Sequence, residues 1–85
     1  MSKIPLRNKK GEIIDYTTVS PEDFEHLNQF KWCKSDGYVK GNGNYRLHRY
    51  IKIEILKETI LENYIVDHQD RNPLNNQRSN LRIIT

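Results

Sequence analysis

The chain has 85 residues, which suffice for one compact domain with a small hydrophobic core. It contains no run of about 18 apolar residues and no apolar leader, so we expect neither a membrane span nor a secretory signal. Its single cysteine, Cys33, excludes an internal disulfide framework and a zinc site built from paired cysteines, which indicates a reducing, intracellular setting. Fourteen Lys and Arg against eleven Asp and Glu give a net charge of +3, which favours a polyanionic partner only weakly.

The first part of the chain, residues 1–50, is predicted to fold as a hairpin, a helix and a second hairpin. An extended segment at 3–7, a turn at 8–11 and a strand at 12–16 form the first hairpin. Ser20 and Pro21, followed by two acidic residues, predict a helix from Pro21 to Gln29. We expect the Ser20 side chain to cap the free amides of its first turn.

The middle of the chain is predicted to contain two more strands, at 31–39 and 44–48, joined by a turn of Gly and Asn residues at 40–43. Residues 49–62 fit both a helical stripe and strand alternation, and their good helix formers favour a short helix. We expect the aromatic rings of Phe30 and Trp32 in the core and Cys33 buried.

Two short apolar strands, at 64–66 and 81–84, flank a polar loop at 69–80 that contains four asparagines. A loop this long and polar in so small a domain is either functional or disordered. The chain is therefore predicted to be a single α+β domain over residues 1–85, with antiparallel hairpins, one or two short helices and a distinct C-terminal motif at 64–85.

Asp67 and His68 end the first of these strands directly before the loop. A carboxylate is a hard oxygen donor suited to Mg²⁺, and a histidine can take a proton from water near neutral pH. Successive strand residues point to opposite faces, so both side chains can serve one site only if the strand ends or bulges there. Metal-assisted phosphodiester hydrolysis needs such a cation and base, but an Asp–His pair at a strand end can also be purely structural.

The C-terminal motif resembles the HNH endonucleases of phage and group I intron homing enzymes. The resemblance is carried by Val66-Asp67-His68, Asn72-Pro73-Leu74-Asn75-Asn76 and Ser79-Asn80-Leu81-Arg82, and segments such as Pro21-Glu22-Asp23-Phe24 and Leu47-His48-Arg49 extend it over the whole chain. It implies a ββα-metal element, divalent-metal-dependent hydrolysis of DNA with Mg²⁺ or Mn²⁺ and, for a phage-encoded protein, a location in the cytoplasm of a bacterial host.

Carried over by position, the resemblance implies that His68 is the general base and Asp67 a metal ligand. It also implies that Asn80 holds the loop and so orients the histidine. The other loop asparagines, which would shape the loop, are Asn72, Asn75 and Asn76. The arginines expected to contact DNA phosphates are Arg71, Arg78 and Arg82, and Arg46 and Arg49 could line a nucleic-acid surface together with nearby tyrosines.

One departure from the family pattern bears on activity. In the ββα-metal element a helix after the second strand supplies the last metal-binding residue, and here Thr85 stands where that helix should begin. We therefore expect weak metal binding at most, either because the sequence is trimmed or because the protein has lost the helix. Two functions stay open: a DNA endonuclease, or an inactive HNH-derived phage protein that binds nucleic acid or inhibits a host nuclease.

Overall fold

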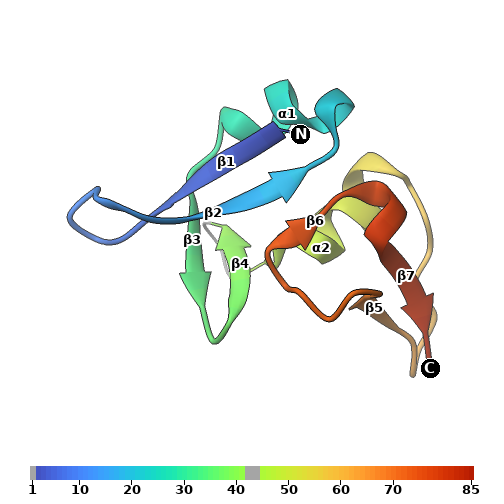
Figure 1. The fold of residues 1–85 in the computed structure, drawn as a ribbon. Coiled ribbons are helices and arrows are strands. Elements are labelled where there is room, and N and C mark those ends of the chain that lie inside the picture. Colours follow the sequence, from blue (N-terminus) through green and yellow to red (C-terminus); the bar gives the residue numbers. More distant parts are fainter. Residues whose placement is uncertain (1, 42–44) are drawn as a thin grey trace.

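The computed structural model describes residues 2–41 and 45–85 and shows a small α+β domain with three separate sheets (Figure 1). The elements are β1 (Ser2–Arg7), β2 (Ile13–Val19), α1 (Pro21–Asn28), β3 (Trp32–Ser35), β4 (Tyr38–Gly41), α2 (Leu47–Tyr50), a π-helical turn (Ile51–Ile55), β5 (Ile65–His68), β6 (Asn75–Asn76), a 3-10 turn (Arg78–Asn80) and β7 (Leu81–Ile84). The predicted fold class is confirmed. Within the described ranges, every helix is too short or too polar to cross a membrane.

The N-terminal hairpin forms as predicted, but β2 runs three residues further, to Val19. In the turn between the strands, the Asn8 side chain accepts hydrogen bonds from the backbone N–H groups of Lys10 and Glu12. The extra length of β2 matters because β6 pairs with it in parallel, with Thr18 opposite Asn75. The polar loop of the C-terminal motif is thereby attached to the N-terminal sheet as its third strand.

Helix α1 confirms the predicted helix to within one residue, but the prediction for Ser20 is wrong. The Ser20 hydroxyl makes no capping bond to the helix. It instead accepts a hydrogen bond of 2.9 Å from the backbone N–H of Arg78, and the N–H of Asp23 is satisfied by the carbonyl oxygen of Ser20. A partner from the far end of the chain thus replaces the local cap.

The middle of the chain differs most from its prediction. The single strand expected at 31–39 is a tight hairpin, because Asp36 and Gly37 adopt φ values of 52° and 81° and turn the chain between β3 and β4. An Asp-Gly pair is a strong signal for this turn. Of the turn expected at 40–43 and the strand at 44–48, residues 42–44 lie outside the described residues. Gly41 belongs to β4, and Leu47 and His48 begin α2 instead of lying in a strand.

The short helix favoured for 49–62 begins earlier and ends sooner than predicted. It starts as α2 at Leu47, widens into the π-helical turn and ends at Ile55, and Lys57, two residues later, has a left-handed φ of 57°. The two C-terminal strands form the antiparallel pair β5–β7, in which Asp67 lies opposite Arg82 and His68 opposite Leu81.

Ten buried apolar side chains form the core where these elements meet. They are Ile4, Leu6, Val19, Leu27, Trp32, Val39, Leu47, Ile51, Val66 and Leu81. Trp32 is buried as predicted, whereas Phe30 is 43% exposed and Cys33 is exposed, so both of those predictions are wrong. Neighbouring strand residues face opposite sides, and burying Trp32 therefore turns Cys33 outward.

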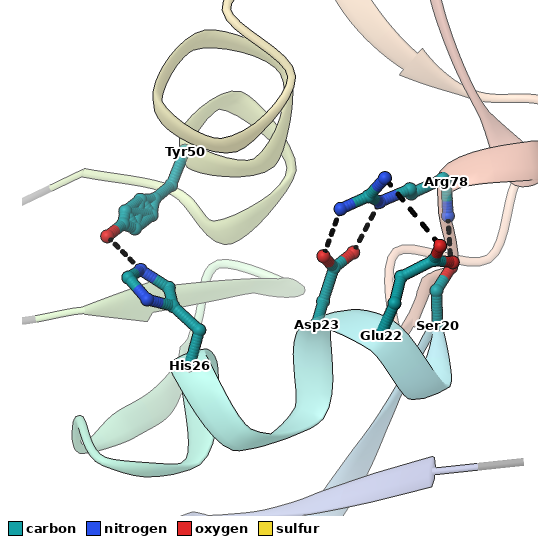
Figure 2. Close-up of polar contacts among 6 residues, drawn as sticks. All are labelled: Ser20, Glu22, Asp23, His26, Tyr50 and Arg78. Atoms are coloured by element: carbon teal, nitrogen blue, oxygen red, sulfur yellow. Dashed lines mark hydrogen bonds and ion pairs between the residues drawn. The ribbon is translucent and has the colours of Figure 1, made fainter.

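The N-terminal helix is tied to the C-terminal motif by an ion pair between Asp23 and Arg78, drawn in Figure 2. Arg78 donates from Nη2 and Nε to the two Asp23 oxygens, at 2.6 and 2.9 Å, across 55 residues of sequence. Asp23 is 1% exposed, and Arg78 retains 34% of its side-chain exposure. These hydrogen bonds hold the pKa of the guanidinium above its ordinary value. The buried carboxylate therefore depends on one arginine for its charge balance.

A second polar feature of the interior is a stack of rings from β4, α2 and β5. The Tyr38 and His48 rings stack at 5.5 Å, and the His48 and His68 centroids lie 4.9 Å apart. Burial, and after it the charges of the nearby His68 and two arginines, lower the pKa of His48 to about 4. His48 is thus neutral in the folded protein near neutral pH.

Replacing Arg78 by Met should destabilise the protein by about 3 kcal/mol, because it leaves the Asp23 carboxylate buried without a counter-charge. Arg82→Met is the matched control, since it removes the exposed arginine of the Asp67 pair and should change the free energy of unfolding by less than about 1 kcal/mol. Urea denaturation of the two variants measures the difference. Equal effects would contradict the structural role given to Asp23.

Acidification should destabilise the protein through His48. In the unfolded chain His48 takes up a proton near the ordinary histidine pKa of about 6.5, whereas in the folded protein its pKa is about 4. The stability that His48 contributes is therefore fully present above about pH 6.5 and is lost as the pH falls toward 4. Between about pH 7.5 and pH 5 the loss should be about 2 kcal/mol. In His48→Phe, which keeps a ring but binds no proton, urea denaturation should show a correspondingly flatter pH dependence, while His26→Gln, at an exposed histidine, should match the wild type.

Candidate functional site

The candidate site is built around His68, the last residue of β5. Its side chain is 5% exposed, and its Nε2 lies 2.9 Å from Oδ1 of Asn76. The neighbouring His48 ring is neutral, so it places no positive charge next to His68. The structure thus holds this histidine by one ring nitrogen beside the rings of Tyr38 and His48.

Asn76, expected only to shape the loop, is itself fixed by the N-terminal sheet. Its Nδ2 donates to Oγ1 of Thr17 at 2.8 Å and to the carbonyl oxygen of Pro73 at 3.1 Å. Thr17 is fully buried in β2 and donates its hydroxyl proton to the carbonyl oxygen of Leu74 at 2.8 Å. Sequence reasoning missed Thr17, because it lies 59 residues before Asn76 and no local pattern distinguishes it.

Asn80 lies where it can hold the loop, as the resemblance implies. Its Nδ2 donates to Oδ1 of Asp70 and to the carbonyl oxygen of Asn75, and its Oδ1 accepts from the N–H of Asp70. Asp70, also missed from the sequence, further accepts from the Asn75 amide and from the Asn72 N–H. The bond from Asn75, followed by those from Asn72 and Asn80, lowers the pKa of Asp70 and keeps it ionised as the centre of the loop.

Asp67 faces away from His68, as alternation along β5 requires. Its Oδ2 pairs with Nη2 of Arg82 at 3.0 Å, and the two side chains are 32% and 50% exposed. Residues 2–41 and 45–85 contain no group of three or more His, Cys, Asp or Glu side chains that could hold a metal ion. The side chains around Asp67 therefore supply one carboxylate and do not complete a metal centre on their own.

The five arginines predicted to contact DNA lie in different settings. Arg78 is engaged with Asp23, and Arg82 with Asp67. The Arg46 guanidinium lies over the Tyr38 ring at 4.5 Å from its centroid. Arg49 and Arg71 are exposed, and Arg71 adopts a left-handed φ of 63° at the start of the loop. Arg49 and Arg71 therefore combine an exposed side chain with no hydrogen bond, ion pair or cation–π contact to another described side chain.

A cationic groove lies apart from the motif, between the β1–β2 hairpin and the β3–β4 hairpin, and has a volume of about 490 Å³. Ile14, Trp32 and Cys33 contribute to its lining. The basic residues that line it are Arg7, Lys9, Lys31, Lys34 and Lys40. The sequence does not reveal this groove, because its cations come from three separate segments and the net charge of the chain is small.

Comparison with known proteins agrees with this arrangement. A family model described as HNH endonuclease matches residues 58–85, which contain His68, Asn76 and Asn80. An uncharacterised HNH endonuclease of Acanthamoeba polyphaga mimivirus is 36% identical over 73 residues, covering 82% of this chain and 39% of the relative. The chain thus spans about two fifths of the length of that relative. No solved structure matches this chain. With the motif residues gathered around one buried histidine, these similarities show that the chain belongs to the HNH endonuclease family.

Proposed function

We propose that this chain takes part in hydrolysis of DNA phosphodiester bonds, with His68 as the general base. The observation that carries the proposal is the setting of His68, which is buried, bonded at Nε2 to a neutral amide and packed at 4.9 Å from the neutral His48 ring. A base held in one orientation is positioned to take a proton from an attacking water. Family membership supports DNA as the substrate.

We further propose that Asp67 is the protein carboxylate that would hold a Mg²⁺ or Mn²⁺ ion. An exposed ion pair such as Asp67–Arg82 contributes at most about 1 kcal/mol, so its carboxylate can exchange partners at little cost. Mg²⁺ in proteins often uses one or two carboxylates together with water and phosphate oxygens. The remaining ligands would be such water and phosphate oxygens.

DNA would lie along the cationic groove, in this proposal, with its phosphates near Lys31, Lys34 and Lys40. Lys34 pairs at 3.2 Å with Asp15, an exposed contact that a phosphate can replace. Lysine and arginine contacts to the phosphate backbone position a protein on DNA without reading its sequence. Exposed Arg49 and Arg71 stay predicted phosphate contacts. The phage origin, the homing role and the bacterial cytoplasm stay predictions as well.

In a plasmid-nicking assay with Mg²⁺ or Mn²⁺, His68→Ala should lower cleavage at least about 100-fold, because the attacking water loses its base. His26→Ala is the matched control, since His26 is an exposed histidine bonded to Tyr50 (Figure 2). It should cleave as the wild type does.

If the wild-type chain binds DNA and nicks nothing with either ion, the endonuclease proposal fails for this chain. The open alternative is then an HNH-derived protein without chemistry, which binds nucleic acid or occupies a host nuclease. A complex with a host nuclease that persists in His68→Ala would support that alternative.

The groove can be tested through Cys33, the single cysteine, which is exposed and lines it. Duplex DNA should slow alkylation of Cys33, and the protection should weaken as salt is raised, because phosphate contacts release counterions. Lys31→Gln should reduce the slope of log Kd against log salt by about 1, whereas Lys57→Gln, at an exposed lysine outside the groove, should leave it unchanged. Unchanged alkylation at saturating DNA would place the duplex elsewhere.

A further inference from the structure

We infer that Thr17 and Asn76 are positioning residues that set which nitrogen of His68 is basic, leaving the lone pair on Nδ1. The inference deepens the proposed function, because it specifies the state of the proposed base. It concerns a contact between the N-terminal sheet and the motif, since Thr17 lies outside residues 58–85, the part of the chain that the family model matches.

Two backbone carbonyl oxygens, which can only accept hydrogen bonds, set the directions of these contacts. Thr17 Oγ1 lies 2.8 Å from the carbonyl oxygen of Leu74, so its hydroxyl must donate there and its oxygen is left to accept. The Asn76 amide lies 3.1 Å from the carbonyl oxygen of Pro73, so the NH₂ group must face that carbonyl. Turning the amide over would place two acceptor oxygens against each other.

The direction of the remaining bonds then follows. With its NH₂ group donating to Pro73 and to Thr17, Asn76 can present only its oxygen to His68. Because that oxygen accepts, Nε2 of His68 must carry the proton across the 2.9 Å contact. A neutral imidazole has one protonated nitrogen, so Nδ1 holds the lone pair.

In one respect, the asparagine oxygen is a better hydrogen-bond partner for a basic histidine than a carboxylate would be. The amide oxygen accepts a hydrogen bond and does not take the proton, so a positive charge formed on His68 stays on the imidazolium. The bond to Asn76 becomes charge-assisted at that moment and strengthens. The neutral His48 ring beside it adds no opposing charge.

The hydrogen bonds have a structural basis in the pairing of β2 with β6. Thr18 lies opposite Asn75 and its N–H donates to the same Leu74 oxygen at 2.8 Å. The backbone of the loop is thus held at the position where the Thr17 hydroxyl and the Asn76 amide meet. Both side chains are buried, at 0% and 1% exposure, so water does not compete for these bonds.

The first test is nitrogen NMR of the full chain labelled with ¹⁵N-histidine, at about pH 8. His68 should show a protonated Nε2 and an unprotonated Nδ1, with an Nε2–H signal that survives exchange with water because the bond is buried. Exposed His26 serves as the internal comparison and should lack a surviving signal. A proton on Nδ1 of His68 would overturn the inference, whether or not the chain cleaves DNA.

The second test uses Thr17→Val, which keeps the shape of the side chain but removes the hydroxyl. We expect the Nε2–H signal of His68 to be lost to exchange, and kcat for nicking to fall about 10-fold with KM unchanged, since DNA contacts are not touched. Thr17→Ser should restore both. Thr18→Val makes the same chemical change one residue along β2 and should leave the signal in place.

The outcomes separate this inference from the proposed function. An Nε2–H signal unchanged in Thr17→Val, in a variant whose circular dichroism matches the wild type, would overturn the inference. If Thr17→Val does not fold, Asn76→Asp supplies the same information. A carboxylate can accept a hydrogen bond from Nε2 but cannot donate one to the Pro73 carbonyl. The Nε2–H signal of His68 should then shift, while Nε2 stays protonated. An unchanged signal in that variant would likewise overturn the role given to Asn76.

Discussion

The buried carboxylate of Asp23 joins the two ends of the chain, because its counter-charge is an arginine of the C-terminal motif. At 1% exposure this carboxylate cannot be solvated by water, and Arg78 places two hydrogen-bond donors against its oxygens instead. An arginine that must meet this carboxylate brings the 3-10 turn to the N-terminal end of α1. Ser20, one turn away, then satisfies the backbone N–H of the same arginine.

Fixing that turn also fixes the polar loop, which has few apolar side chains with which to hold itself. Residues 69–80 contribute no member of the buried apolar core. The loop is instead held internally through Asp70 and Asn80 and externally through Arg78 and the β2–β6 pairing. A segment ordered almost wholly by hydrogen bonds keeps one conformation only if its partners are themselves rigid.

The HNH motif is therefore not an independent unit within this domain. Its histidine is held by Asn76, and Asn76 is held by Thr17. Thr17 belongs to β2, which lies far before the motif in the sequence. In the part of the chain that the structure describes, the N-terminal hairpin serves both as the scaffold of the proposed base and as one wall of the cationic groove. Hydrolysis and DNA contact, as proposed, would share one supporting sheet.

Local signals in the sequence were enough to predict several elements and the centre of the candidate site. The hairpin turn at Asn8, the helix begun by Pro21 and the strands around the loop depend on neighbouring residues, so their patterns are visible in the chain. The motif at Val66 to Arg82 likewise identified His68, Asp67 and Asn80 as residues to examine, and family membership followed from it. The Asp-Gly turn at Asp36 was equally local and was missed, because the later glycines competed for the same prediction.

Only the tertiary structure decided how the polar side chains were paired. Ser20 could cap its own helix, Arg78 could face DNA and Asn76 could shape only its loop, and each choice satisfies the same donors and acceptors. Burial removes water as a partner, so the choice goes to whichever group lies within hydrogen-bonding distance in the folded chain. For these residues that group lies 55 to 59 residues away. Local sequence patterns were enough to predict the fold class, the family and the histidine, whereas the packing of β2 and α1 against the loop sets how that histidine is held.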